Sequence, residues 1–180
     1  MTGKAKNLRL GDPFREDVQL GPIVNEKQVA RVDDIVQRSI SAGAVVNEGA
    51  TFEGLFYRPT VLTSVTPDMP AFTDEIFGPV APITVFGDDE EAIALANASS
   101  YGLVASIYTG SISRGLAFAD RMRTGMVHIN DGTLNDEAII PFGGMGDSGN
   151  GSRYGGEASL DTFTEWQWVT VRDEPPTFPF

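Results

Sequence analysis

The chain of 180 residues contains no cysteine and only one histidine. Disulfide bonds and thiolate metal sites are therefore impossible, and this polypeptide cannot supply a thiol nucleophile. Basic residues are also scarce, because 13 lysines and arginines stand against 25 aspartates and glutamates, for a formal net charge of −12. Such a charge repels a phosphate backbone, so we expect no nucleic-acid partner.

Long apolar runs are missing as well. No stretch of the chain approaches the roughly 20 apolar residues that span a bilayer, and the acidic charge opposes binding to anionic lipid surfaces. The N-terminal residues 1–6 include two lysines, but no apolar segment follows them, which is not the pattern of a secretory signal. We therefore expect no membrane partner and a cytoplasmic protein.

The spacing of apolar residues predicts a first long helix over residues 26–42. Asn25 precedes it as a good N-cap residue, and Gly43 is a natural end. The apolar positions recur every three or four residues and give the helix one buried face. These positions are Val29, Val32, Ile35, Val36 and Ile40.

Further along, short apolar segments alternate with helical patterns. Residues 80–86, 102–108 and 126–129 are predicted to be strands buried on both faces. Helices are predicted between them, over 88–97 with an acidic first turn and over 111–122 with Leu116, Phe118 and Ala119 on the inner face. This order predicts an α/β fold with a mostly parallel sheet.

The C-terminal third begins with a long glycine-rich segment, residues 130–156, which we expect to be a functional loop. Asn130 should hold the following loop through side-chain bonds to the backbone. His128 lies in an apolar strand and is expected to be a core residue with its hydrogen bonds satisfied, not a catalyst or metal ligand. Residues 162–171 alternate in polarity, which predicts an edge strand.

Two segments carry motifs. Residues 73–80 read TDEIFGPV, and composition alone would make Glu75 an exposed loop acid. Residues 144–149 fit G-x-G-x-x-G, directly after Pro141-Phe142-Gly143. A dinucleotide fingerprint follows a strand and opens a helix, and this segment does neither, so its glycines are expected to serve tight turns.

Both segments resemble signatures of the NAD(P)-dependent aldehyde dehydrogenase family. The string E-I-F-G-P-V is intact at residues 75–80, and P-F-G-G is intact at 141–144, although Gly146 replaces the usual lysine. The resemblance runs in order along essentially the whole chain, covers only the C-terminal part of the family, and is similar to the benzaldehyde and vanillin dehydrogenase branch. It implies that residues 1–160 are the C-terminal portion of the catalytic domain and that 161–180 form an oligomerisation strand and tail.

The resemblance also implies site residues. Glu75 would accept hydrogen bonds from the hydroxyls of the nicotinamide ribose, and Phe77 would pack beside the same group. Phe142 would line the aldehyde tunnel, although an ordinary core aromatic is an equally open reading. In the parent family a cysteine thiolate attacks the aldehyde, NAD or NADP takes the hydride, and water releases the acid. This chain has no catalytic residue of that kind, so we expect it to be inactive and to bind neither cofactor by itself.

Three interpretations of the chain remain open. It is a truncated or excised part of an aromatic aldehyde dehydrogenase that forms homo-oligomers and acts on small aldehydes. It is a stand-alone oligomerisation module whose apolar tail pairs with another chain. In the third and weakest interpretation the chain is a cofactor-binding remnant, although Glu75 alone cannot hold a dinucleotide.

Overall fold

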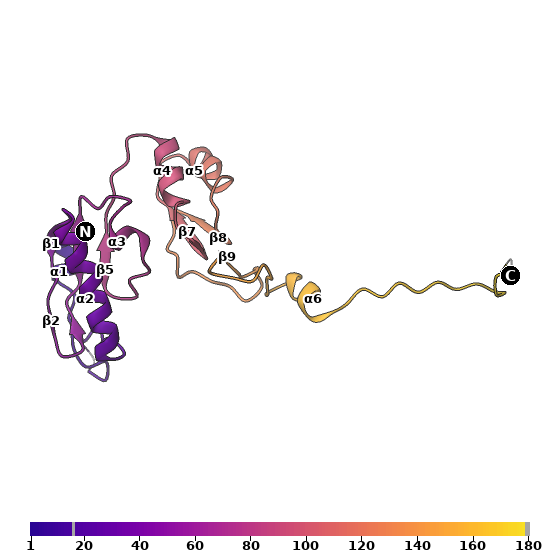
Figure 1. Cartoon of the computed structure of the whole chain (residues 1–180), viewed down its shortest axis with the longest axis horizontal. Helices are drawn as coiled ribbons and strands as arrows, with labels where there is room; N and C mark the ends of the chain where they lie inside the picture. Colours follow the sequence, from indigo (N-terminus) through magenta and orange to yellow (C-terminus); the bar gives the residue numbers. More distant parts are fainter. Residues whose placement is uncertain (16, 179–180) are drawn as a thin grey trace. The chain divides into compact units, whose positions relative to one another are not determined.

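The computed structural model describes residues 1–15 and 17–178 (Figure 1). They divide into two compact units, Met1–Leu95 and Ala96–Phe180, which are described separately below. Helix α6 (Ala158–Phe163) lies in the second unit. Within the described part of the chain, no helix combines the length and apolar character needed to cross a bilayer.

The first unit contains a mixed three-stranded sheet, a hairpin and several helices. Strand β1 pairs antiparallel with β4, and β4 pairs parallel with β5, while β2 and β3 form an antiparallel hairpin. The elements of this unit, with the helix that ends at the boundary, are α1 (Thr2–Lys6), α2 (Glu26–Ser41), β1 (Val45–Glu48), β2 (Phe52–Glu53), β3 (Phe56–Tyr57), β4 (Thr60–Thr63), α3 (Pro70–Thr73), β5 (Val80–Pro82) and α4 (Asp89–Ala96).

Helix α2 confirms the sequence prediction and supplies the centre of the core. Asn25 caps it, because its side-chain oxygen accepts a hydrogen bond from the backbone nitrogen of Gln28 at 2.9 Å. The predicted apolar face is buried except for the last position, Ile40, which is half-buried. Each buried side chain of this kind contributes about 1.5–3 kcal/mol to folding. The core around the helix includes Val29, Val32, Ile35, Val36, Tyr57, Leu62, Val65 and Met69.

The strand predicted over residues 80–86 is shorter than expected. Strand β5 ends at Pro82, and Val85 is 81% exposed, so the expected burial of the whole segment on both faces is wrong. The reason lies in the neighbouring strand. Strand β4 ends at Thr63, and Ser64 turns the chain with a left-handed φ of 57°. The last backbone bonds between the two segments join Ile83 to Leu62 and Val65, and the segment leaves the sheet after them.

The second unit is built on a strand–helix–strand unit. Strands β7 (Val104–Ile107) and β8 (Met126–Ile129) pair in parallel, and helix α5 (Ile112–Ala119) connects them and packs on both (Figure 1). Strand β8 has the predicted bounds. Both strands are half-buried in this chain, where burial on both faces was expected.

The inner face of α5 differs from the prediction. Leu116 is 55% exposed, whereas Phe118 and Ala119 are half-buried, and Gly115 is the buried residue of the helix. A Cβ at Gly115 would lie 2.9 Å from Cγ2 of Ile129, so the missing side chain allows the helix to approach β8 directly. The helix therefore contacts the strand through a glycine, which a hydrophobic pattern does not detect.

The remaining elements of the second unit are β6 (Tyr101–Gly102), which pairs antiparallel with β9 (Met145–Gly146), and α6. The α/β class is confirmed, but the expected predominance of parallel strands is corrected. In the described chain, β4–β5 and β7–β8 are parallel, and the other pairs are antiparallel. Parallel pairing requires a crossover connection, which α5 provides between β7 and β8, whereas the antiparallel β2 and β3 form a hairpin.

The tail does not form the expected strand within this chain. Residues 162 and 163 belong to α6, and the described residues after them form no strand. Trp166 and Trp168 are 100% and 91% exposed. An alternating segment becomes a strand only when another strand pairs with it, and the described chain offers none here.

Candidate functional site

The segment with Glu75 is a short loop of the first unit between α3 and β5. Its side chains alternate, because Ile76 is buried at 8% exposure while Glu75 and Phe77 on either side are exposed. Ile76 therefore anchors the loop in the core. The Glu75 carboxylate has no hydrogen-bond or ionic partner among the residues that the structure describes, so both of its oxygens are free to accept.

Side chains of helix α2 donate hydrogen bonds to the backbone of this loop. The side-chain nitrogen of Gln28 donates to the carbonyl oxygens of Ile76 and Phe77, at 3.2 Å each. Nη2 of Arg31 donates to the carbonyl oxygen of Glu75 at 3.0 Å. Three successive carbonyls are thus bound to one helix, and the loop has a defined conformation.

Phe77 has an unusual backbone. Its φ is 53°, in the left-handed region that bulky residues avoid, and its ring is 75% exposed. Gly78 follows, and a Cβ there would lie 2.7 Å from Cγ2 of Val32. The chain at this point therefore lies directly on α2. A mainly apolar cavity of about 410 Å³ adjoins the loop, lined by Leu20, Gly21, Pro22, Ile23, Val24, Gln28, Phe77, Gly78 and Pro79.

The segment with Phe142 belongs to the second unit. Phe142 pairs with Tyr154 in an antiparallel bridge, with hydrogen bonds of 2.7 and 3.1 Å between their backbones. Their rings also meet, with centroids 5.3 Å apart and an angle of 46° between the planes. Nη1 of Arg153 donates to the carbonyl oxygen of Gly144 at 3.1 Å and closes the turn. Phe142 is half-buried, and its partner Tyr154 was not singled out from the sequence, although it lies in the glycine-rich segment 130–156.

As the sequence analysis predicted, the G-x-G-x-x-G match at residues 144–149 is not a dinucleotide-binding fingerprint. The short strand β9 lies inside it, and no helix follows it before α6. Gly146 takes a φ of 57°, which confirms the expected use of glycine in a tight turn.

Comparison with known proteins decides the family. A model of the aldehyde dehydrogenase family matches residues 1–169. The chain belongs to the aldehyde dehydrogenase family. It is 53% identical over 177 residues to the NAD(+) benzaldehyde dehydrogenase of Pseudomonas putida, covering 98% of this chain and 36% of that protein. It is 50% identical over 181 residues to a vanillin dehydrogenase of Amycolatopsis, covering 100% of this chain and 37% of that protein.

Solved structures of aldehyde dehydrogenases share the fold. A Mycobacterium tuberculosis aldehyde dehydrogenase complexed with NAD+ superposes with a TM-score of 0.81 at 35% identity, covering 87% of this chain and 33% of that one. A succinate-semialdehyde dehydrogenase of Burkholderia pseudomallei gives a TM-score of 0.84 at 34% identity, covering 90% and 34%. The chain therefore spans about a third of the length of these relatives.

Asn130 of this aldehyde dehydrogenase chain binds loop backbone with its side chain, as predicted, but the loop is a different one. Its side-chain oxygen accepts from the nitrogen of Thr109 at 2.8 Å, and its side-chain nitrogen donates to the oxygen of Thr109 at 2.9 Å. Asn130 therefore holds the loop after β7, and the expectation that it holds the following loop is corrected. The ends of parallel strands lie side by side, so the nearest backbone belongs to the neighbouring strand.

His128 departs from expectation. Its Nε2 is buried and has no hydrogen-bond partner among the described residues, so the prediction of a satisfied histidine is wrong. A cavity of about 310 Å³ adjoins it, lined by Gly125, Met126, Val127, His128, Asn135, Asp136, Glu137, Ile140 and Pro141. Hydrogen bonds from Asn135 and the nitrogen of Gly132 hold the pKa of nearby Asp131 below its usual value. No group of three or more potential metal ligands occurs in the described chain.

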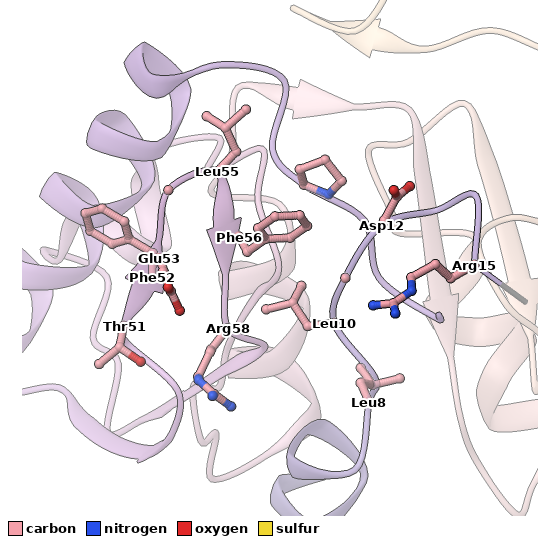
Figure 2. A pocket seen from close by; sticks show the side chains of 13 residues that line it. Leu8, Leu10, Asp12, Arg15, Thr51, Phe52, Glu53, Leu55, Phe56 and Arg58 are labelled. Atoms are coloured by element: carbon pink, nitrogen blue, oxygen red, sulfur yellow. The ribbon is translucent and has the colours of Figure 1, made fainter. Parts of the chain in front are cut away.

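A larger cavity lies in the first unit between the segment at 8–15 and the β2–β3 hairpin, with a volume of about 930 Å³ (Figure 2). Figure 2 shows Leu10 and Phe56 between the two segments, with the charged side chains of Arg15 and Arg58 beside them. The sequence motifs do not reach this cavity, and Asp12 and Glu53 also line it, so its charges are mixed.

Proposed function

We propose that this chain is the C-terminal part of the catalytic domain of an NAD(P)-dependent aldehyde dehydrogenase that oxidises an aromatic aldehyde to its carboxylic acid. The observation that carries the proposal is the loop at Glu75, in which a free carboxylate and an exposed ring are held on a helix. The similarity to benzaldehyde and vanillin dehydrogenases at 53% and 50% identity supports the aromatic substrate class.

The residues of the loop fit a ribose. A carboxylate with both oxygens free can accept hydrogen bonds from two vicinal hydroxyls at once. The ring of Phe77 provides an apolar surface next to it. The nicotinamide cofactor, when bound, supplies the hydride acceptor. Glu75 and Phe77 would bind and orient its ribose, and Phe142 would form part of the wall that receives the aldehyde.

The nucleophile must come from elsewhere. The chain contains no cysteine, so the thiolate chemistry of the family is outside its reach. We expect no cofactor reduction when purified chain is mixed with NAD and benzaldehyde, and no saturable NAD binding in a calorimetric titration. Measurable turnover by the purified chain would contradict this part of the proposal.

The decisive experiment restores the missing part. In a chimera, the part of this chain that matches the Pseudomonas putida benzaldehyde dehydrogenase, 98% of its length, replaces the matching part of that enzyme. We expect the chimera to reduce NAD with benzaldehyde, and Glu75→Gln to raise the KM for NAD. The matched control is Glu53→Gln, which changes an exposed glutamate of the same unit away from the loop. If Glu75→Gln left the KM for NAD unchanged, the assigned role would be wrong.

The second candidate function is assembly. The residues after α6 present a row of exposed apolar side chains with no partner strand in the described chain, Trp166, Trp168, Val169 and Val171. An exposed apolar segment of this kind favours association. We propose that it pairs with a second copy, and that the chain is a dimer or larger species by light scattering. Deleting residues 164–180 should yield a monomer, and a monomeric full chain would contradict the proposal.

A further inference from the structure

The turn after the G-x-G-x-x-G match contains Asn150, the only asparagine of the chain that a glycine follows. Asn150 and Gly151 are both exposed. When glycine follows asparagine, the backbone nitrogen of the glycine can attack the side-chain amide carbon, because no Cβ crowds that nitrogen. The two reacting groups belong to adjacent residues and close a five-membered ring, so the reaction requires no group from elsewhere in the chain.

The attacking nitrogen is available in this structure. Among the residues that the structure describes, neither the carbonyl oxygen of Asn150 nor the nitrogen of Gly151 takes part in a hydrogen bond. A Cβ at Gly151 would meet nothing within 4 Å, and the φ of this residue is 93°. The peptide group that joins the two residues therefore has neither bonds nor neighbours that oppose its rotation toward ring closure.

The side chain of Asn150 is held as an electrophile. Its Oδ1 accepts from the backbone nitrogen of Ser152 at 3.0 Å and from Oγ of Ser152 at 2.7 Å. Attack on Cγ moves negative charge onto Oδ1, and donors already aimed at this atom stabilise the charged intermediate more than the neutral amide. The leaving nitrogen, Nδ2, is not bonded to any described residue.

We propose that Asn150 is a site of spontaneous covalent modification, at which Gly151 closes a succinimide ring. A bond forms between the Gly151 nitrogen and Cγ of Asn150, and the bond between Cγ and Nδ2 breaks. The amide proton of Gly151 leaves with Nδ2 as ammonia. Water then opens the ring at one of its two carbonyls and produces aspartate or isoaspartate, so no oxidant, reductant or cofactor takes part.

The modification changes the turn that carries Phe142. Isoaspartate routes the main chain through the side-chain carbon and lengthens it by one methylene group. The residues that follow the turn are Arg153, which donates to the carbonyl oxygen of Gly144 at 3.1 Å, and Tyr154, which pairs with Phe142. Both contacts depend on the length of the turn, so the segment with Phe142 changes as the molecule ages.

The first test ages the purified 180-residue chain in water enriched in the heavy oxygen isotope and maps its peptides by mass spectrometry. We expect isotope incorporation at Asn150 about tenfold or more faster than at Asn97 and Asn130, with both aspartate and isoaspartate as products. In these two controls both amide atoms are hydrogen-bonded, and the next residue is not glycine. Equal rates at the three sites, or aspartate without isoaspartate, would overturn the proposal.

The second test removes one of the two donors. Ser152→Ala keeps the backbone N–H and loses Oγ, so the conversion of Asn150 should slow by about threefold or more. The matched control, Ser41→Ala at the exposed end of α2, should leave the rate unchanged. In urea, where the turn is unfolded, Ser152→Ala and wild type should convert at the same rate. A wild-type rate in folded Ser152→Ala would contradict the role assigned to the hydroxyl.

The third test follows the consequence by NMR. On ageing, the amide signals of Phe142 and Tyr154 should split into two sets in wild type, in proportion to the isoaspartate found by mass spectrometry. Asn150→Gln keeps an amide but would have to close a larger ring, so its signals should remain single. A single set of signals in extensively modified wild type would refute the effect on the bridge.

Discussion

Replacing Gly78 with alanine should destabilise the first unit by a purely steric effect. A Cβ at this position would lie 2.7 Å from Cγ2 and 3.1 Å from Cγ1 of Val32. Val32 is 0% exposed at the centre of the core, so it has little room to move. The φ of Gly78 lies outside the left-handed region, so alanine can adopt the backbone, and the contact with Val32 decides the outcome.

The magnitude follows from the overlap. Carbon atoms in ordinary contact are about 3.5 Å apart or more, so the added methyl would overlap Cγ2 by about 0.8 Å. Extra methyl groups forced into a packed core cost about 1–3 kcal/mol. For a unit of this size, about 2 kcal/mol corresponds to a fall in Tm of roughly 10 °C.

The assay is thermal unfolding followed by circular dichroism, supported by hydrogen exchange of the α2 amides to report on the first unit. Gly21→Ala is the matched control, because its Cβ would meet nothing closer than 3.8 Å. Combining Gly78→Ala with Val32→Ala should recover about 1 kcal/mol or more relative to the sum of the single variants, because the smaller residue makes room for the methyl group. Wild-type stability of Gly78→Ala, or an additive double variant, would refute the packing of the loop on α2.

Three further predictions concern stability. Burial raises the pKa of Tyr57, so the free energy of unfolding should fall as the pH rises above the ordinary tyrosine value of about 10. The urea midpoint should therefore be lower at pH 11 than at pH 8, and the decrease should be smaller in Tyr57→Phe. Asn130→Ala removes both bonds to Thr109 and should cost about 1–3 kcal/mol in urea unfolding. Ser39→Ala leaves the buried nitrogen of Ala71 without its acceptor at 2.9 Å and should cost about 1–3 kcal/mol in the same assay.

Each of these has a control on the same chain. Tyr108→Phe changes a ring that is 73% exposed and should leave the alkaline decline in place. Asn130→Asp keeps the acceptor for the Thr109 nitrogen but loses the donor, so it should be less harmful than alanine. Ser41→Ala at the exposed end of α2 should stay within about 0.5 kcal/mol of wild type. Equal losses in a test variant and its control would contradict the corresponding assignment.

The sequence predicted those elements whose causes are local. Helix α2 combines a capping asparagine with a regular apolar face, and strand β8 is a short apolar run between turn residues, so both appear where expected. The α/β class followed from the alternation of such elements. These features depend on residues close in sequence, which a pattern can detect.

The predictions that the structure corrects all depend on contacts between residues that are distant in the sequence. The end of β5 depends on where β4 ends, and the inner face of α5 depends on how closely Gly115 can approach Ile129. The tail shows an alternating pattern, but its pairing strand would have to come from outside the described chain. The unpartnered Nε2 of His128 also depends on which groups from other elements reach it. A pattern along the chain carries no information about such neighbours.

The Glu75 loop depends both on residues close together in the sequence and on contacts with distant ones. Its motif is local and was found from six consecutive letters, but the conformation that makes the motif useful depends on α2. Gly78 has to be glycine because Val32 lies beneath it, and the left-handed φ of Phe77 occurs beside carbonyls that Gln28 binds. The same helix that forms the hydrophobic core therefore also orients the proposed cofactor anchor.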